Sequence, residues 1–429
     1  MLRTLTYIFL LLFSFSVNAQ EPDVTYMPNI QGIKLYIQGN QLGYPIIALN
    51  SSSLLELHFD DMEGRVKNYY YTFQLCNADW TPVNLSTFDY LKGFSQIRIN
   101  QYRQSSISQT KYVHYQAIIP DRNCVPVKSG NYMLKVFLDG DQEKIAFTRR
   151  ILVFDKLADV GMQVVQPFNT EIFRTHQKVV FQVDKAQLNV VNPVQQVKAV
   201  VLQNYRWDNA KLNISPTFIR NNTMEFNDEN TLVFPAGKEY RWADLRSFRL
   251  QTERVAKAES TPGNIQLYLQ PDAERTQQRF INFTDYNGFY FVESREVSNP
   301  WWQSDYATVH FTFVPKGNQP FADKKIFVVG EMNEYNTRDT SAMTYNSTDG
   351  VYEKTMYLKQ GYYSYNYVTK DSKLKKSTSQ TELTDGNYWE TENDYTVLIY
   401  YRSLSGRHDE LIGFSTVNSL GSRRLDFNR

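Results

Sequence analysis

This chain of 429 residues contains few cysteines and few histidines, and it has almost no excess of positive or negative charge. Two cysteines cannot supply the several disulfides on which small secreted scaffolds depend, so the fold must rest on hydrophobic cores. The five histidines are scattered, with no His-x-x-x-His spacing, and together with two cysteines they form no zinc signature. We therefore expect neither a metal nor a cofactor.

Charge is nearly balanced, with 46 Lys and Arg against 45 Asp and Glu. A nucleic-acid-binding protein needs a basic field to attract phosphates, and a polybasic membrane clamp needs a similar excess. Beyond the amino terminus, no stretch approaches the eighteen or so apolar residues that a transmembrane helix requires. The sequence thus predicts no nucleic-acid partner and no membrane insertion.

The amino terminus has the pattern of a secretory signal peptide over residues 1–19. Arg3 supplies the positive charge, and an apolar run follows over Tyr7–Phe13. Val17 and Ala19 place small residues before a cleavage site at Gln20. A transmembrane anchor is the alternative interpretation, but the apolar run is short for that role. We expect an exported protein without a lipid anchor, because no cysteine stands at the cleavage site.

The two cysteines, Cys76 and Cys124, remain after export. They form either one disulfide or two buried free thiols, and the sequence favours neither alternative.

Motifs of common enzymes are absent. The chain contains no Gly-x-Ser-x-Gly elbow and no Walker loop. The carboxylate pair Asp60–Asp61 lies at an expected turn, where acidic residues usually cap or face solvent. We therefore predict that the protein is not an enzyme.

Short alternating runs of apolar residues, bounded by turn residues, dominate the chain. Such runs predict strands, and the lack of regular helical segments favours antiparallel sandwiches over a parallel α/β sheet. We predict an all-β protein of three consecutive immunoglobulin-like β-sandwich domains. The predicted boundaries are an N-terminal sandwich at 20–156, a middle sandwich with long loops at 157–296, a C-terminal sandwich at 297–405 and a polar tail at 406–429.

Aromatic residues are abundant, with 30 Tyr, 27 Phe and 6 Trp. Aromatic residues that follow one another place rings on both faces of an extended segment. One face can fill a core, and the other must then meet solvent, another domain or a partner. Tyr and Trp are common at interfaces because they bury a large area and keep a polar atom. Packing between domains of the same chain is the alternative. The residues that we predict to contact a partner are Trp80, Tyr90, Trp301, Trp302 and Tyr335.

In the predicted C-terminal sandwich, a resemblance is carried by Val329–Asn336, Met343, Gly350–Glu353 and Leu358–Tyr367. These segments resemble the carbohydrate-binding sandwich of glycogen-branching and related proteins. In those modules a tryptophan that stacks on sugar follows the asparagine-bearing turn, whereas Tyr335 stands there in this chain. The resemblance implies an immunoglobulin-like fold. It also supports the alternative hypothesis of a secreted glycan-binding protein that uses an exposed Tyr335 or Tyr352.

A second resemblance is carried by segments spread along the whole exported chain: Leu57–Asp61, Cys76–Trp80, Tyr90–Phe94, Tyr112–Tyr115, Ser129–Tyr132, Leu358–Tyr363 and Glu390–Tyr395. In these segments and in their order, the chain resembles the plug proteins of the type IX secretion system of Bacteroidetes. The resemblance implies a periplasmic protein, one copy of which binds a very large outer-membrane β-barrel translocon and blocks its periplasmic mouth when no cargo passes.

Overall fold

The computed structural model describes residues 22–421 and the backbone of 426–427, apart from residues 186, 189, 375 and 376. The predicted signal peptide, 1–19, lies outside the described residues. Regular structure in the described part is almost entirely β-strand, as the sequence predicts. None of the helices described there is long and apolar enough to cross a membrane. They are α1 (Thr87–Tyr90), α2 (Pro193–Gln196), α3 (Pro300–Gln303), η1 (Lys316–Asn318), η2 (Glu331–Asn333) and η3 (Asp339–Ser341).

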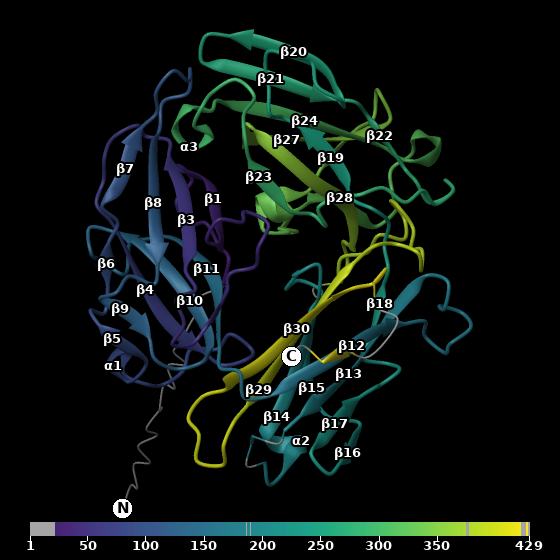
Figure 1. Cartoon of the computed structure of the whole chain (residues 1–429). Helices are drawn as coiled ribbons and strands as arrows, with labels where there is room; N and C mark the ends of the chain where they lie inside the picture. The colour runs from purple at the N-terminus through teal and green to yellow at the C-terminus, as the bar shows by residue number, and fades with distance from the viewer. Residues whose placement is uncertain (1–21, 186, 189, 375–376, 422–425, 428–429) are drawn as a thin grey trace, which may run out of the picture.

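The larger sheets pack face to face in three pairs, which we call the first, second and third sheet pairs (Figure 1). The first pair is formed by residues 30–154, and a small ribbon of β5 (Leu91–Gly93) and β9 (Cys124–Pro126) flanks it. One of its sheets has the order β1 (Ile30–Ile37), β3 (Leu55–Asp61), β8 (Val113–Ile119) and β7 (Gln101–Gln104). The other has the order β2 (Ile46–Ala48), β11 (Ile145–Phe154), β10 (Gly130–Leu138), β4 (Tyr69–Cys76) and β6 (Ile97–Arg98).

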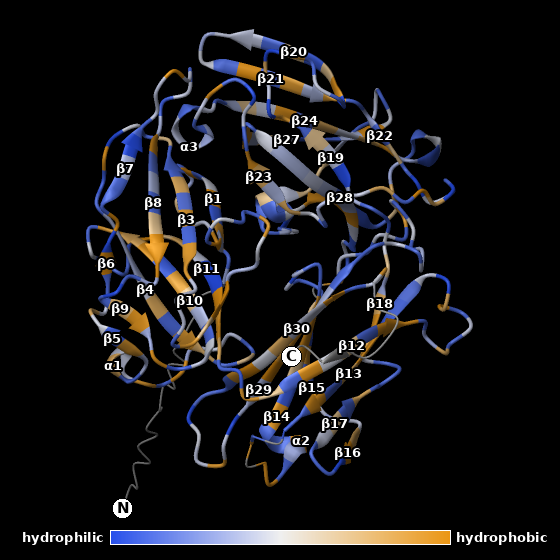
Figure 2. Cartoon of the chain, in the orientation of Figure 1, coloured by the Kyte–Doolittle hydropathy of each residue, from blue (hydrophilic) through white to orange (hydrophobic). Residues whose placement is uncertain are grey.

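Alternation along β3 shows why these residues form a strand at this place. Leu55, Leu57 and Phe59 point into the core between the two sheets and are fully buried. Apolar residues concentrate along such strands, whereas the connecting loops are mostly hydrophilic (Figure 2). The opposite face of β3 carries His58 and Asp60, which are polar and nevertheless buried. Another part of the chain must therefore cover that face.

The second sheet pair is discontinuous in sequence. Its first sheet has the order β16 (Phe218–Arg220), β17 (Thr223–Phe226), β13 (His176–Asp184), β12 (Asp159–Val165) and β31 (Asp426–Phe427), with β18 (Val233–Pro235) also pairing with β13. Its second sheet has the order β15 (Lys211–Ile214), β14 (Val197–Gln203), β29 (Asp394–Tyr401) and β30 (Glu410–Asn418).

The third sheet pair is formed by the residues between β18 and β29. One sheet has the order β19 (Arg241–Asp244), β28 (Gly361–Asp371) and β23 (Tyr290–Val292), with β25 (Lys324–Val329) also on β28. The other has the order β20 (Val255–Thr261), β21 (Asn264–Leu269), β24 (Tyr306–Val314), β27 (Val351–Lys359) and β26 (Thr344–Asn346), with β22 (Asp272–Ala273) on β24.

Strand pairing crosses the predicted boundary between residues 296 and 297. Strand β14, from the predicted middle block, pairs with β29, from the predicted C-terminal block, over Val197↔Tyr401 to Gln203↔Tyr395. Figure 1 shows the yellow strands β29 and β30 lying beside the teal strands of the second pair. The prediction of a polar tail at 406–429 is also wrong, because β30 lies within these residues and pairs with β29. Alternation reveals a strand but not its distant partner.

The first and second sheet pairs share an apolar contact. One cluster of buried side chains joins Trp80 and Met133 of the first pair to Leu202, Leu398 and Leu411 of the second. This cluster is separate from the cores inside the two pairs. The contact therefore resembles a core rather than a hydrated surface.

Both cysteines are free and buried, so the structure has the second of the two predicted alternatives. Cys76 belongs to the apolar cluster between the first and second sheet pairs. Cys124 belongs to the core of the first pair. The two thiols thus lie in separate apolar environments, and burial raises the pKa of each to about 12. A disulfide between them is not formed.

Candidate functional site

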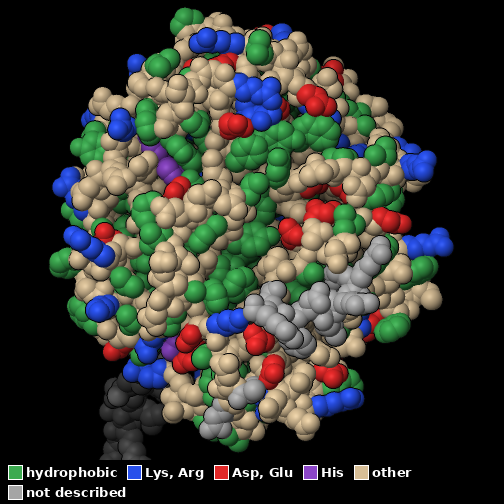
Figure 3. Space-filling view, in the orientation of Figure 1, with side chains coloured by type: hydrophobic (Ala, Val, Ile, Leu, Met, Phe, Trp, Pro, Cys, Tyr) green, Lys and Arg blue, Asp and Glu red, His purple; other side chains and the backbone are tan. Residues whose placement is uncertain are grey.

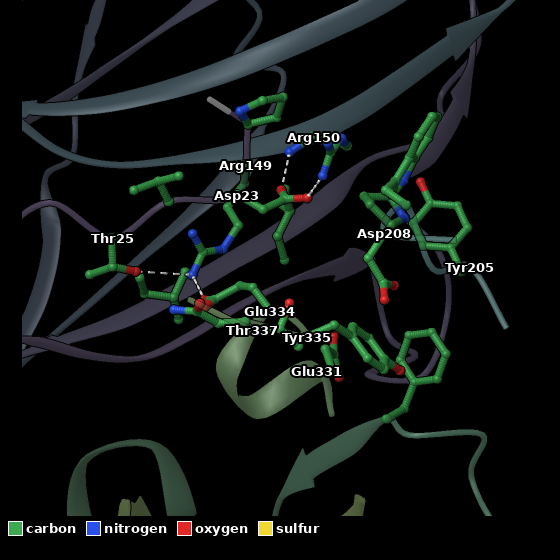
Figure 4. A pocket seen from close by; sticks show the side chains of 18 of the residues that line it. Asp23, Thr25, Arg149, Arg150, Tyr205, Asp208, Glu331, Glu334, Tyr335 and Thr337 are labelled. Atoms are coloured by element: carbon green, nitrogen blue, oxygen red, sulfur yellow. Dashed lines mark hydrogen bonds and ion pairs between the residues drawn. The ribbon is translucent and has the colours of Figure 1, made fainter. Parts of the chain in front are cut away.

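A pocket of about 460 Å³, which we call the central pocket, lies where the three sheet pairs meet. Side chains from all three pairs converge on it (Figure 4). Its lining includes Asp23, Thr25, Ile33, Leu35, Pro45, Arg149 and Arg150 from the first pair and the segment before it, Tyr205, Trp207 and Asp208 from the second, and Phe289, Glu331, Glu334, Tyr335 and Thr337 from the third.

Four of the charged side chains that line the central pocket form two ion pairs with one another. Arg149 forms an ion pair with Glu334, which joins the first sheet pair to the third (Figure 4). Arg150 pairs with Asp23, whose carboxylate also accepts a hydrogen bond from the Arg150 backbone N–H at 2.8 Å. Burial raises the pKa of the Glu334 carboxyl, and the guanidinium of Arg149 opposes this rise. The pocket therefore presents little net charge to a ligand.

Several wall residues have backbone conformations that side chains disfavour. Asp23, Tyr205, Glu334 and Tyr335 have φ values of 53°, 54°, 52° and 52°. The left-handed region costs residues other than glycine roughly 1–2 kcal/mol each. Such residues concentrate at functional sites, where surrounding contacts hold them in place. Two of these contacts are the stacking of Tyr44 on Tyr205, with ring centres 4.3 Å apart, and the ion pair of Arg149 with Glu334.

Three buried polar atoms at the pocket wall have no hydrogen-bond partner among the described residues. They are the Tyr205 hydroxyl, the Trp207 Nε1 and the Arg150 Nε. All three groups can donate a hydrogen bond.

Two of the predicted partner-binding residues lie inside the protein. Trp80 is 7% exposed and packs edge-on against Trp207, with ring centres 5.0 Å apart. Tyr90 is 2% exposed and belongs to the core of the first sheet pair. The prediction that these two rings contact a partner is therefore wrong. Both rings pack against other residues of the same chain, as the alternative interpretation expects.

The other three predicted residues lie at contacts between sheet pairs and are half-buried. Trp301 stacks on His58, with ring centres 3.8 Å apart, and Arg103 lies over the ring of Trp302 at 4.7 Å. Tyr335 lines the central pocket. The structure thus brings only Tyr335 of the predicted set to this site, and partner contact by these three rings stays a prediction.

The glycan-binding hypothesis loses one of its two residues. Tyr352 is 5% exposed and lies in the core of the third sheet pair. A buried ring cannot stack on a sugar.

Asp60 is the centre of a buried polar network that covers the outer face of β3. Its carboxylate accepts hydrogen bonds from the Tyr306 hydroxyl at 2.5 Å and from His114 Nδ1 at 2.7 Å, and it forms an ion pair with Lys359. Tyr306 and Lys359 belong to the third sheet pair, so this network joins it to the first. Burial acts to raise the pKa of Asp60, but Lys359 and His114 outweigh it and hold the pKa below its usual value.

The hydrogen bonds of this network are satisfied when both histidines are neutral. Since His114 Nδ1 donates to Asp60, His114 Nε2 is free to accept a hydrogen bond from His58 Nδ1, which lies 3.1 Å away. In this tautomer, a second proton on His114 would place its Nε2–H against the Nδ1–H of His58. Burial, together with repulsion from a protonated His114, lowers the pKa of His58 to about 2, and burial also lowers that of His114.

Stability should consequently fall in mild acid. His58 has a pKa of about 2 in the folded chain and 6.5 in its reference state, so its contribution is complete above pH 6.5 and is lost as the pH falls toward 2. We expect His58→Gln to reduce the slope of unfolding free energy against pH by about 1 kcal/mol per pH unit between pH 6 and 4. Urea unfolding at pH 7.5, 6, 5 and 4 measures this slope, and parallel profiles for both proteins would contradict it.

Segments that carry the family resemblance meet at these contacts between sheet pairs. Leu57–Asp61, Tyr112–Tyr115 and Leu358–Tyr363 supply Asp60, His114 and Lys359 to the buried network. The sequence carries one further signal for these residues. Polar residues at every second position of β3 are expected at the surface, yet His58 and Asp60 lie within a segment that resembles the family. The pocket walls, by contrast, include many residues outside those segments.

Comparisons with known proteins agree with this geometry. Residues 30–155, which contain both sheets of the first pair, match the family described as type 9 secretion system plug protein 1st domain. A crystal structure of a hypothetical protein from Parabacteroides merdae is similar to this chain, with a TM-score of 0.88 and 28% sequence identity over 93% of this chain and 100% of that chain. No curated protein matches it. Residues 30–155 are therefore similar to the first domain of type 9 secretion system plug proteins.

Proposed function

We propose that this protein is a periplasmic plug, which binds the periplasmic opening of the very large outer-membrane barrel of the type 9 secretion system and seals it when no cargo passes. The observation that carries the proposal is the family match of the first sheet pair. That family is a structural component of a secretion system and is not a known enzyme family. Membership implies association with the translocon of that system.

The size of the chain suits this role. The largest known single-chain barrels have about 36 strands, which gives a backbone diameter of about 70 Å for strands about 4.8 Å apart and tilted by about 40°. A compact body of about 400 residues is roughly 55 Å across, whereas one of about 125 residues is only about 35 Å across. One sheet pair alone would leave most of the opening uncovered.

Stiffness of the whole chain also supports the proposal. The first sheet pair is joined to the second by the apolar cluster and by a hydrogen bond from the Tyr400 hydroxyl to Asn131 at 2.7 Å. It is joined to the third by the network around Asp60, and Asn287 donates a hydrogen bond to Glu392 between the third and the second at 3.1 Å. A preorganised body loses little conformational entropy when it docks.

The face of the protein shown in Figure 3 is compatible with a contact that can be released. Lys, Arg, Asp and Glu side chains are interspersed over the face in Figure 3, and no continuous patch of one sign occupies that face. Removable contacts are typically polar and hydrated, unlike permanent ones. This mixed surface fits repeated docking and release.

Deletion tests the proposed seal. A strain that lacks this chain should admit a large antibiotic that the outer membrane normally excludes, because the barrel would be left open. A strain that lacks both the chain and the barrel should regain resistance, and the wild-type chain should restore it to the single mutant. Minimum inhibitory concentrations for the four strains measure this. Equal sensitivity with and without the barrel would contradict the seal.

A further inference from the structure

We propose that one end of the first sheet pair binds the surface of a membrane that contains anionic phospholipids. We call this end the ribbon tip and define it as residues 86–94 and 121–128, which include α1, β5 and β9. Phe88 and Phe94 enter the lipid, and the basic side chains around them meet the headgroups. This peripheral contact goes beyond the sealing of a barrel and does not depend on it, and it needs no membrane-spanning segment.

The ribbon of β5 and β9 presents one face to solvent. The pairing of the two strands continues past β5, because the Phe94 N–H donates a hydrogen bond to the Asn123 carbonyl at 2.6 Å. Successive side chains of a strand point to opposite faces. Leu91 is 3% exposed and belongs to the core of the first sheet pair, whereas Lys92 and Phe94 are exposed. Lys92 and Phe94 therefore share the outer face of the ribbon.

Apolar side chains are concentrated on the outer side of the ribbon tip. Phe94 is 65% exposed, and Val127, directly after β9, is 41% exposed. Phe88 is 75% exposed, whereas Tyr90, two residues further along α1, is buried in the core. Two such residues lie about 200° apart around a helix axis, so Phe88 points away from that core. Single exposed apolar residues are ordinary, but two phenylalanines and a valine on one short ribbon form a patch that favours contact with an apolar phase.

Unpaired basic groups surround this patch. Lys92 and Arg122 are exposed, Lys128 is half-buried, and none of the three forms an ion pair with a described residue. Asp89 and Asp121 are the acidic residues of the tip, and each accepts a hydrogen bond from a backbone N–H of its own turn, at 3.0 and 2.8 Å. An apolar cleft in a protein would supply no counter-charge for the three cations. Anionic headgroups supply it directly beside the lipid chains, and each Lys or Arg near such a surface strengthens binding.

A loop of the second sheet pair extends the same pattern. The guanidinium of Arg407 donates a hydrogen bond to the Asn84 carbonyl at 2.7 Å, which places the loop between β29 and β30 beside the ribbon tip (Figure 1). This loop also carries Leu404, which is 73% exposed. Apolar and basic side chains from two distant parts of the chain therefore meet at one end of the protein, and a membrane surface complements both kinds of group.

Vesicle flotation of the purified exported chain tests the proposal. The vesicles consist of phosphatidylcholine alone or of an equal mixture of phosphatidylcholine and phosphatidylglycerol. We expect the chain to float with the mixed vesicles and to bind pure phosphatidylcholine at least about tenfold more weakly, because the basic groups act only on an anionic surface. Absence of binding to the mixed vesicles would indicate a protein partner for the tip and overturn the proposal. Equal binding to both kinds of vesicle would also overturn it.

Matched variants locate the contact. Phe88→Ser combined with Phe94→Ser should weaken binding to the mixed vesicles by about tenfold or more, since each buried ring contributes a factor of about ten. Phe168→Ser is the control, because Phe168 is 85% exposed but lies between β12 and β13 of the second sheet pair. Lys92→Gln combined with Arg122→Gln should lower binding to the mixed vesicles toward the level for phosphatidylcholine. All these side chains are exposed, so the melting temperature should not change. Equal binding by the Phe88/Phe94 variant and the control would overturn the proposal.

Discussion

Replacing Asp60 with alanine should lower the free energy of unfolding by about 3–5 kcal/mol, because it leaves the buried ammonium of Lys359 without its counter-charge. Lys359 is 2% exposed, so water cannot solvate the charge in place of the carboxylate. The change also removes the acceptor for the Tyr306 hydroxyl and for His114. Urea unfolding at pH 7.5 measures the loss.

A double variant separates the effect of the unpaired buried charge from the other effects of replacing Asp60. The double variant Asp60→Asn with Lys359→Met removes both charges and keeps similar volumes, so it should recover more than half of the stability that Asp60→Asn alone loses. A loss below about 1 kcal/mol for Asp60→Ala, or no recovery in the double variant, would show that the network contributes little. The first and third sheet pairs would then be held together by their other contacts.

Leu398→Ala should lower the free energy of unfolding by about 2–5 kcal/mol, through the lost apolar contacts and the cavity that remains. Leu398 is fully buried in the cluster between the first and second sheet pairs. Leu250→Ala is a matched control, because Leu250 is 68% exposed and should cost less than about 0.5 kcal/mol. Urea unfolding under the same conditions compares the two.

Equal losses for these two leucine variants would contradict the core-like character of this contact. The losses for Leu398→Ala and Asp60→Ala can also be compared, because the first sheet pair contacts the second and the third through opposite chemistry. One is apolar, and the other is built on buried charges and hydrogen bonds. Both sets of groups are excluded from water, so each is expected to depend strongly on its neighbours.

The candidate site shows where inference from residue types reaches its limit. The sequence predicts partner contact for Trp80 and Trp301 because large rings are common at interfaces. Both rings lie at interfaces, but these are contacts within the chain. Ring size and polarity are the same for an internal and an external contact, so residue type cannot distinguish them. Tyr335, one of the residues predicted to contact a partner, lines the central pocket. Tyr205 and Arg150 also line it, but nothing in their local sequence indicates a role there.

Local sequence determined the strands, since alternation such as that of Leu55, Leu57 and Phe59 depends only on which side chains must leave water. It also determined the resemblance to the plug family, which the match over residues 30–155 bears out. Only the tertiary structure decided that β14 pairs with β29, that His58 and Asp60 are buried, and that three sheet pairs enclose a pocket. These features depend on contacts between residues far apart in the chain, and a strand's own residues do not specify which distant strand or sheet will cover them.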